Sequence, residues 1–434
     1  MSQLPTAPPS GFRDFLPASC AMRARAAEAI AQVYRRFGFQ QIATSAVEDL
    51  PVLLGKGGGE NEKLIFKLMK RGAQLEEAKT SGGELADLGL RFDLTLPLAR
   101  YYCRHGSTLP HPFKAFQMGA VWRAERAQKG RYREFHQCDA DIIGSDSPLC
   151  EAEIISALLT AFEAAGLREA PQAVVNDREL LQAVLSEAGL PAEKTAAACV
   201  ALDKLDKTGV EAVRGELEAL SGSEVARRLE ELLLSKPGDL ERLSRFQPQA
   251  AARVREILSL VNGLRADSAV FSATLIRGFD YYTGPVFEFR SPRLSGSLGG
   301  GGRYDRLTEK FGGQPIPACG ASIGFERLLL LLEQEGLETA PGPDAVVTVF
   351  SEQLRAASLK AAAALRHAGY AIDLYPGAGK LKKQFQYADA KKAAYAVVIG
   401  PDELAAGQAT VKDLATGKER SVALDSLAEA VKKG

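Results

Sequence analysis

The chain has 434 residues, 46% hydrophobic and 25% charged, a globular composition with room for roughly two to four domains. Lys plus Arg equals Asp plus Glu, at 54 each, so the overall charge indicates no polyanionic partner. The first residues, MSQLPTAPPS, form no apolar signal segment, and no stretch approaches the roughly 18 to 20 apolar residues that span a bilayer. We therefore expect a cytoplasmic protein with no membrane contact.

Near the N-terminus, residues 20–37 carry apolar side chains at helical spacing and end before Gly38, which predicts a helix followed by a strand in FQQIATSAV. The run from Lys67 to Gly89 is rich in Gly, Lys and Glu with little periodicity, which predicts a mobile loop between strands. The segment LRFDLTLPLARYY predicts a strand that turns into a helix at Pro97.

Further along, HPFKAFQMGAVWRAER predicts two strand segments, and REFHQCDADIIG predicts one strand. We expect a helix in SPLCEAEIISALLTAFEAAG, with Ser147 as its N-cap and Gly166 as its C-cap. From about Asp177 to Ala266 the sequence shows 3.6-residue periodicity and almost no strand signal, which predicts a helical insertion.

After the insertion, strand patterns return in SAVFSATLIRGFDYYTGPVFEFR and SLGGGGRYDRL, and a helix is predicted in GFERLLLLLEQEG. The two halves are therefore predicted to form one antiparallel-sheet domain. Strands and helices alternate beyond the linker ETAPGPD, which predicts a separate small α/β domain. Residues 344–434 hold 13 Lys/Arg against 10 Asp/Glu, a modest basic excess compatible with RNA phosphates, with five lysines clustered: Lys380, Lys382, Lys383, Lys391 and Lys392.

The segment WRAERAQKGRYREF gathers five cations between two strand patterns: Arg123, Arg126, Lys129, Arg131 and Arg133. Guanidinium groups bind phosphate oxygens through two parallel hydrogen bonds and stay charged at any working pH. An Arg-rich hairpin therefore suits a polyphosphate such as that of ATP. A solvated basic loop is the alternative.

Arg277 is the lone cation of LIRGFDYYTGPVFEF, which otherwise has the pattern of an apolar strand. A buried cation needs an anionic partner. That partner is either a ligand phosphate or carboxylate, or an internal acid, Asp280 or Glu288. GGGGRYDRL would let backbone approach a ligand closely, although such a run is a flexible turn in most proteins. CGASIGFERLLLLL is predicted to begin a helix whose second turn carries Arg327.

Six cysteines are scattered along the chain without CxxC or Cys/His spacing: Cys20, Cys103, Cys138, Cys150, Cys199 and Cys319. This spacing indicates neither a zinc site nor a disulfide framework. We expect each of them to be a buried, reduced thiol.

Several segments together resemble one family. FQMGAVWRAERAQKGRYREFHQ resembles motif 2 of class II aminoacyl-tRNA synthetases, and GASIGFERL resembles motif 3. The two signatures of histidyl-tRNA synthetases resemble RGFDYYTG and GGGGRYD. That family is similar to this chain in two more segments, GFRDFLP and KLKKQFQYADAKKAAYAVVIGPDELAAG. The resemblance therefore extends from about residue 11 to 420. The resemblance implies an α+β fold: a class II antiparallel-sheet catalytic domain (1–176 and 271–336), a helical insertion domain (177–270), and a small C-terminal α/β anticodon-binding domain (343–434).

The resemblance also implies an activity: ATP-dependent activation of L-histidine to histidyl-adenylate, then transfer to the 3′ end of tRNA(His), with release of AMP and diphosphate. Mg²⁺ would arrive with ATP rather than in a protein cage, so no metal site is expected. A homodimer is implied as well. Here Ser45 stands where motif 1 of the family has a proline, so the expected dimer interface depends on the surrounding helix and strand.

Residue roles follow by position in the matching motifs. Arg123 and Arg277 would be catalytic and bind the α-phosphate and the histidine carboxylate, with Arg277 stabilising charge in the transition state. The other implied ATP-binding residues are Glu125, Arg131, Phe135 and Arg327, with Phe135 stacked on adenine. The implied histidine-binding residues at the α-amino group are Asp93, Thr95 and Gln137. Those at the imidazole are Asp141, Tyr282 and Tyr304. Tyr281 and Arg277 are also implied to bind histidine. Asp93 and Asp141 are shorter acids where many members carry Glu.

Two alternatives remain open. A synthetase-like regulatory subunit of ATP phosphoribosyltransferase would bind histidine without charging tRNA, but such subunits generally lack the anticodon-binding domain. A class II synthetase for another amino acid would not be expected to carry RGFDYYTG. The insertion should emerge near the tRNA acceptor end, with a role in dimer stability as the alternative. Its arginines are expected to make a few phosphate contacts: Arg214, Arg227, Arg228, Arg242, Arg245, Arg253 and Arg255.

Overall fold

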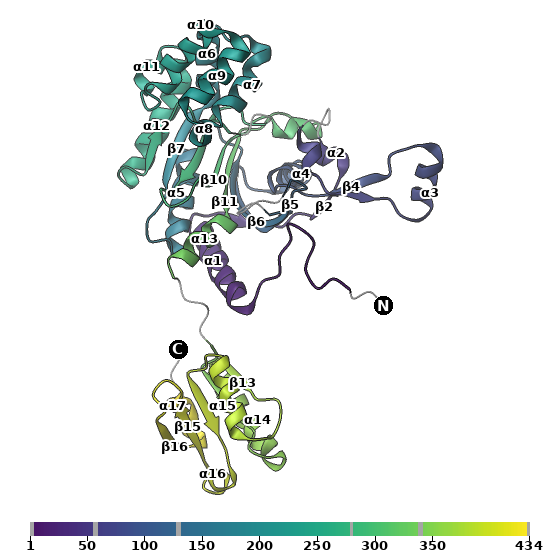
Figure 1. The fold of residues 1–434 in the computed structure, drawn as a ribbon, viewed down its shortest axis with the longest axis vertical. Helices are drawn as coiled ribbons and strands as arrows, with labels where there is room; N and C mark the ends of the chain where they lie inside the picture. Colours follow the sequence, from purple (N-terminus) through teal and green to yellow (C-terminus); the bar gives the residue numbers. More distant parts are fainter. Residues whose placement is uncertain (1–3, 55–59, 127–131, 278–280, 337–341, 432–434) are drawn as a thin grey trace. The chain divides into compact units, whose positions relative to one another are not determined.

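The computed structural model describes residues 4–54, 60–126, 132–277, 281–336 and 342–431, which divide into two compact units at residue 337. Figure 1 shows both units, coloured along the chain. Among the described helices, none has the length and apolar character needed to cross a membrane.

The first unit is built on an eight-stranded sheet with the order β1-β5-β6-β11-β10-β9-β7-β8. Neighbouring strands are antiparallel except for the pairs β1–β5 and β7–β8. Strands from before and after the helical segment therefore share one sheet, and the predicted α+β class is confirmed. The strands are β1 (Gln40–Gln41), β5 (Phe113–Trp122), β6 (Glu134–Ile143), β7 (Gln172–Asp177), β8 (Ala269–Phe271), β9 (Pro285–Arg290), β10 (Ser297–Arg303) and β11 (Ala318–Gly324).

One face of this sheet is covered by α1 (Pro17–Arg36), α5 (Leu149–Ala164) and α13 (Phe325–Gln334). Side chains alternate along a strand, so Cys138, Ala140 and Ile142 of β6 enter the apolar core beneath these helices. The alternate residues, Gln137, Asp139 and Asp141, point to the opposite face. The strand pattern thus places polar groups on the face that the helices leave open.

A small three-stranded sheet, β2-β4-β3, corrects the expectation for Lys67–Gly89. The predicted irregular loop was wrong, because the segment contains a helix between two strands. Only Ala78 of that helix is buried, so it has little apolar periodicity, and Gly82 ends it in the left-handed conformation (φ 68°) with its N–H donated to the Ala78 carbonyl. In Figure 1 this helix lies at the tip of an arm. The elements are β2 (Val47–Asp49), β3 (Lys67–Met69), α3 (Gly72–Ser81) and β4 (Ala86–Leu90).

Between β7 and β8 the chain is helical. The apolar faces of these helices join the core below the sheet. The helices are α6 (Arg178–Glu187), α7 (Thr195–Leu202), α8 (Leu205–Thr208), α9 (Val210–Ser221), α10 (Ser223–Leu229), a π-helical turn (Glu230–Leu234), α11 (Leu240–Ser244) and α12 (Pro248–Leu264). The remaining helices of the unit are α2 (Leu50–Leu54), α4 (Thr95–His105) and 3-10 turns at Glu60–Leu64, Gly106–Thr108, Ala192–Lys194 and Leu307–Phe311.

The arginines of this helical segment have partners within the chain. Arg253 lies 3.0 Å from the buried Asp177 carboxylate, which caps α6, so this arginine holds the segment to the sheet. Arg245 lies over the Phe246 ring. The other ion pairs are Arg214–Glu230, Arg227–Glu224, Arg227–Glu231, Arg228–Glu224, Arg242–Asp239 and Arg255–Glu241.

Several local predictions need correction. FKAFQMGAVW forms one continuous strand, β5, rather than two, because its pairing with β6 runs unbroken through Gly119, which also leaves room for the Arg91 guanidinium. The N-cap of α5 is Pro148, although the Ser147 hydroxyl still accepts the Leu149 N–H at 3.3 Å. Its C-cap is Ala165, one residue before the predicted Gly166. Two thiols expected to be buried, Cys20 and Cys103, are exposed.

The second unit has its own sheet and its own apolar core. The sheet order is β13-β12-β14-β15-β16, with the first three strands parallel and the last three antiparallel. The five lysines predicted to form a basic face are all exposed. The elements are β12 (Ala345–Val347), α14 (Arg355–His367), β13 (Ile372–Leu374), α15 (Leu381–Ala390), β14 (Tyr395–Val398), α16 (Pro401–Ala405), β15 (Gln408–Asp413), β16 (Glu419–Ala423), α17 (Leu427–Ala430) and 3-10 turns at Glu352–Leu354 and Leu424–Ser426.

Candidate active site

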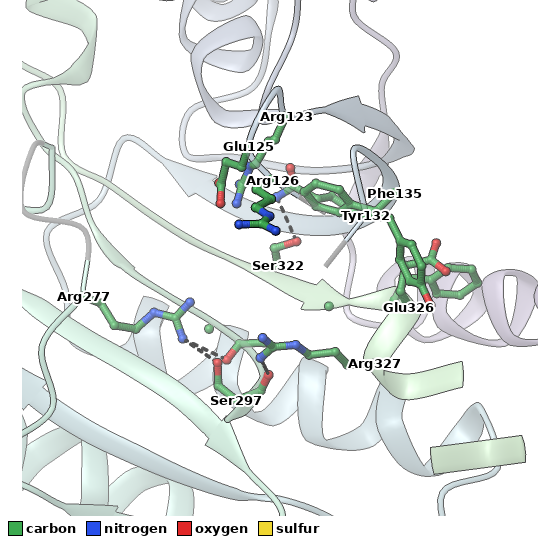
Figure 2. Close-up of a pocket in the computed structure, with 15 residues that line it drawn as sticks. Arg123, Glu125, Arg126, Tyr132, Phe135, Arg277, Ser297, Ser322, Glu326 and Arg327 are labelled. Atoms are coloured by element: carbon green, nitrogen blue, oxygen red, sulfur yellow. Dashed lines mark hydrogen bonds between the residues drawn. The ribbon is translucent and has the colours of Figure 1, made fainter. Parts of the chain in front are cut away.

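A cavity of about 370 Å³ lies on the open face of the eight-stranded sheet, a size typical of small-molecule sites. Its walls come from the β5–β6 hairpin, β10, β11 and the start of α13 (Figure 2). It contains seven of the residues that the sequence singled out, namely Arg123, Glu125, Arg126, Phe135, Gln137, Arg277 and Arg327.

The sheet face around the cavity combines polar and very small residues. Asp139 pairs in register with Gln117 of β5 and Ser322 of β11, and Ser322 pairs in turn with Gly300 of β10. A Cβ at Gly300 would lie 2.5 Å from the Phe287 carbonyl oxygen and would overlap the Arg277 guanidinium. The glycine run is therefore a paired strand rather than a flexible turn, and its missing side chains make room for Arg277 above the sheet.

Arg277 reaches the cavity from an irregular segment, not from the strand that the sequence predicted. Its Nη1 donates to Glu288 Oε2 at 3.1 Å, to the Gly299 carbonyl at 3.2 Å and to Ser297 Oγ at 3.3 Å. The internal acid that the sequence left open is therefore Glu288, while Asp280 lies outside the described residues. Because Arg277 also lines the cavity, with 27% of its side chain exposed, this ion pair and a ligand contact are compatible.

Arg327 and Arg123 face the cavity from other walls. Arg327 is the third residue of α13, so it lies in the first helical turn rather than the predicted second, and its Nη1 donates to the Ser297 carbonyl at 2.5 Å. Figure 2 shows Arg277 and Arg327 approaching Ser297 from opposite sides. Arg123 donates its Nε to the Phe92 carbonyl at 3.1 Å, and its guanidinium lies 5.0 Å from the centre of the Phe135 ring. The guanidinium groups of Arg123, Arg277 and Arg327 therefore line one cavity, together with that of Arg126.

Arg131, the remaining predicted ATP ligand, lies outside the described residues, as does Lys129. Among the side chains that the structure describes, no group of three or more His, Cys, Asp or Glu could hold a metal ion. The carboxylates lining the cavity are Glu125 and Glu326. Glu326 is already occupied by arginines 2.5 and 2.7 Å away.

A second cluster, of one acid and three tyrosines, holds four of the eight residues predicted to bind histidine, namely Asp141, Tyr281, Tyr282 and Tyr304. Tyr304 donates its hydroxyl to Asp141 Oδ1 at 2.5 Å, and its ring lies 6.2 Å from that of Tyr281. The hydroxyls of Tyr281 and Tyr282 are 3.4 Å apart. Burial raises the pKa of Asp141 to about 7, against the lowering effect of the Tyr304 hydrogen bond.

Two buried oxygens in this region have no hydrogen-bond partner among the described residues, namely Asp141 Oδ2 and Gln137 Oε1. Leaving buried acceptors unpaired is costly, so such atoms often mark the place of a ligand donor. Both atoms accept hydrogen bonds, which indicates a ligand that presents N–H groups on this side of the cavity. The arginines indicate anionic groups on the other side.

The structure places Asp93 and Thr95 at the start of α4. Asp93 is buried and accepts the Leu96 N–H through Oδ1 at 3.2 Å. Burial raises the pKa of Asp93, while its hydrogen bond to Leu96 and the charge of Arg123 lower it. Asp93 thus has a local structural role, and its role at the α-amino group stays a prediction. Thr95 is the first residue of α4.

Sequence reasoning missed Asp139, Ser322, Tyr132 and Glu326. Asp139 is buried, and burial together with the charge of Asp141 raises its pKa well above the ordinary value. Its signal was the two-residue spacing of Gln137, Asp139 and Asp141, which puts all three on one strand face. Tyr132, Ser322 and Glu326 line the cavity, and only the adjacency of Glu326 to Arg327 could have indicated its place.

Two family models match the chain. The family model described as histidyl-tRNA synthetase matches residues 11–328, and the model described as an anticodon binding domain matches residues 344–434. The chain belongs to the histidyl-tRNA synthetase family. The histidine–tRNA ligase of Phocaeicola vulgatus is 36% identical over 98% of both chains, and that of Leifsonia xyli subsp. xyli is 40% identical over 92% of this chain and 98% of its own.

Solved structures of the family agree with this assignment. The crystal structure of histidyl-tRNA synthetase from Nostoc sp. PCC 7120 superimposes with a TM-score of 0.82 at 29% identity, covering 99% of both chains. A structure from Bacillus halodurans C titled as an ATP phosphoribosyltransferase regulatory subunit/histidyl-tRNA synthetase superimposes with a TM-score of 0.72 at 23% identity over 89% of this chain. That second likeness concerns the fold alone.

Proposed function

We propose that this chain is a histidine–tRNA ligase that forms histidyl-adenylate in the arginine-lined cavity and transfers the histidyl group to tRNA(His). The observation that carries the proposal is the pairing of two opposite environments on one sheet face. Arg123, Arg277 and Arg327 offer guanidinium donors to phosphates and a carboxylate. Beside them, Asp141 Oδ2 and Gln137 Oε1 offer buried acceptors to the N–H groups of an amino acid.

In the first step a carboxylate oxygen of histidine attacks the α-phosphorus of ATP, the bond to the bridging oxygen breaks, and diphosphate leaves. The nucleophile is already anionic, so no general base is needed. The enzyme positions the two substrates and neutralises the charge that builds on the α-phosphate. Arg277 and Arg123 perform that neutralisation, and Glu288 and the Phe92 carbonyl hold their side chains in place.

ATP occupies the cavity with its adenine stacked on Phe135. Arg327 and Arg131 bind the outer phosphates. Mg²⁺ would enter with ATP and would supply charge neutralisation at the phosphate oxygens. The Glu125 carboxylate at the cavity wall would be the side chain to hold it.

Histidine lies against the acids and tyrosines. Asp93, Thr95 and Gln137 hold the α-amino group, and Asp141 with Tyr282 and Tyr304 hold the imidazole ring. A pocket of paired polar groups rejects analogues that lack the matching hydrogen bonds, because its own buried atoms are then left unpaired. The aromatic neighbours add an apolar wall, since the rings of Tyr281 and Tyr282 pack with their centres 4.5 Å apart.

The remaining parts serve tRNA and assembly. The second unit reads the anticodon of tRNA(His), with its exposed lysines near the phosphates. The helical segment contacts the acceptor end, where its paired arginines exchange a glutamate for a phosphate. Replacing Arg227 and Arg228 together by Ala should weaken tRNA binding and reduce its log-log salt slope by about one to two units, and an unchanged affinity and slope would reassign the segment to dimer stability.

The working form is a cytoplasmic homodimer, and light scattering tests its mass. Ser45 replaces the proline of motif 1. Its hydroxyl donates to the Val47 carbonyl at 2.5 Å and accepts the Val47 N–H at 3.2 Å, so a side-chain turn restrains the backbone ahead of β2.

The competing function is a regulatory subunit of ATP phosphoribosyltransferase that binds histidine without charging tRNA. The match of residues 344–434 to an anticodon binding domain favours the ligase. Charging of purified tRNA(His) with labelled histidine separates the two, because only the ligase forms an acid-precipitable, base-labile ester. Histidine binding without any charging would reject the proposed function.

A further inference from the structure

The segment before α1 packs against the β5–β6 hairpin at Arg133. The Gly11 carbonyl accepts the Arg133 N–H at 2.9 Å, and the Ser10 carbonyl accepts Arg133 Nη1 at 3.3 Å. Gly11 has φ +88°, and a Cβ there would lie 2.7 Å from the Arg133 side chain. Only glycine therefore allows the backbone to turn this close to the β5–β6 hairpin.

Two residues further on, Arg13 joins two separate walls of the cavity. Its guanidinium lies 3.3 Å from the centre of the Tyr132 ring, on the hairpin side. It also donates Nη2 to Glu326 Oε2 at 2.5 Å, on the α13 side. Tyr132 and Glu326 both line the cavity at the same end (Figure 2), whereas Arg13 does not line it and remains behind the two walls.

Glu326 is the centre of this arrangement. Arg23 of α1 donates two further bonds to its carboxylate, at 2.7 and 2.8 Å, and the His136 N–H approaches it at 3.4 Å. Burial opposes ionisation of Glu326, but the hydrogen bonds from Arg23 and Arg13 outweigh it and lower its pKa. The carboxylate is therefore a fixed anion that anchors the first turn of α13, one residue before Arg327.

We propose that Arg13 is a positioning residue for ATP. It sets the distance between the Tyr132 wall and the Glu326–Arg327 wall, and so fixes the width of the nucleotide end of the cavity. The inference rests on the proposed function only in naming ATP as the occupant. Arg13 touches no substrate and acts through the side chains that do.

The test compares Arg13→Gln with Arg35→Gln, a change of the same kind at an exposed arginine at the far end of α1. Michaelis constants for ATP and histidine come from pyrophosphate exchange, and ATP affinity comes independently from calorimetry on the full chain. Arg13→Gln should raise the ATP constant about tenfold or more and leave the histidine constant within about twofold. Arg35→Gln should change neither. Arg13→Lys keeps the ion pair and loses the planar stack, so it should fall between Gln and wild type.

Tyr132→Leu removes the stacking contact between Arg13 and Tyr132 from the hairpin side, and it should reproduce the ATP-specific defect. Combined with Arg13→Gln it should add little, because both changes break one link. A folded Arg13→Gln protein with an unchanged ATP constant, or with equal losses for ATP and histidine, overturns the proposal. If Arg13→Gln does not fold, unchanged ATP constants in both Arg13→Lys and Tyr132→Leu overturn it instead. Wild-type protein that binds ATP but shows no histidine-dependent exchange contradicts the proposed function, and the calorimetric ATP comparison still decides the role of Arg13.

Discussion

Replacing Asp141 by Asn tests the histidine pocket at the atom that lacks a partner. Asp141 Oδ1 accepts the Tyr304 hydroxyl, and Oδ2 is buried with no partner among the described residues. The Asn side chain can retain the Tyr304 bond through its carbonyl oxygen. Its amide then presents N–H groups where the carboxylate presented an acceptor, so a donor of the imidazole ring meets another donor.

A hydrogen bond from a neutral donor to a charged acceptor contributes about 1.5–3 kcal/mol. Its loss corresponds to a factor of about 10 to 150 in affinity. The Michaelis constant for histidine in pyrophosphate exchange should rise by this factor in Asp141→Asn, while the constant for ATP stays within about twofold. Asp146→Asn, at an exposed aspartate five residues along the chain, is the matched control and should behave as wild type.

The same variant should also change the pH dependence of kcat/KM for histidine. Burial holds the pKa of Asp141 at about 7, so the carboxyl is protonated below that pH and loses the charge that attracts the imidazole N–H. The histidine ring itself protonates below a pKa of about 6.5. In wild type, kcat/KM for histidine should therefore fall more steeply below pH 6 than in Asp141→Asn, by up to the further factor of about 10 to 150 that the charged acceptor contributes. An unchanged histidine constant, or parallel pH profiles in the two proteins, would refute the assignment of Asp141 to the imidazole.

Three further predictions follow from other contacts. Arg277→Ala should lower the single-turnover rate of adenylate formation about 100-fold or more with the circular dichroism spectrum retained, and a near-normal rate in the folded variant would remove its catalytic role. Gly320→Ala would place a Cβ over the Asp141 carboxylate and near the Tyr304 hydroxyl, so histidine activation should be lost, whereas Gly215→Ala, where nothing lies within 4 Å, should leave activity unchanged. Deleting residues 343–434, which lie in the second compact unit, should spare adenylate formation more than tRNA charging, and equal loss of both in a soluble truncated dimer contradicts this division.

The sequence predicted the fold class because its strands and helices have the periodicities of a half-buried sheet and its covering helices. Only the family motifs allowed the sequence to predict which arginines gather at the cavity. The charge of the segment alone also allowed a solvated basic loop. It could not reveal that Arg277 is held by Glu288, Ser297 and the Gly299 carbonyl, because these residues meet only after β9 and β10 pair.

The errors have physical causes as well. Helix α3 was missed because a helix with one buried residue has almost no apolar period. Asp139 was missed because its burial depends on the strands on either side of β6. The link from Arg13 to Glu326 spans 313 residues of sequence, and no local pattern indicates such a contact.

Amino-acid-dependent exchange of labelled pyrophosphate into ATP, measured with each standard amino acid in turn, tests the central claim most directly. Wild-type protein should exchange with histidine far above every other amino acid, and Asp141→Asn should lose that preference through the histidine Michaelis constant. Exchange that is equal or greater with another amino acid would contradict the account.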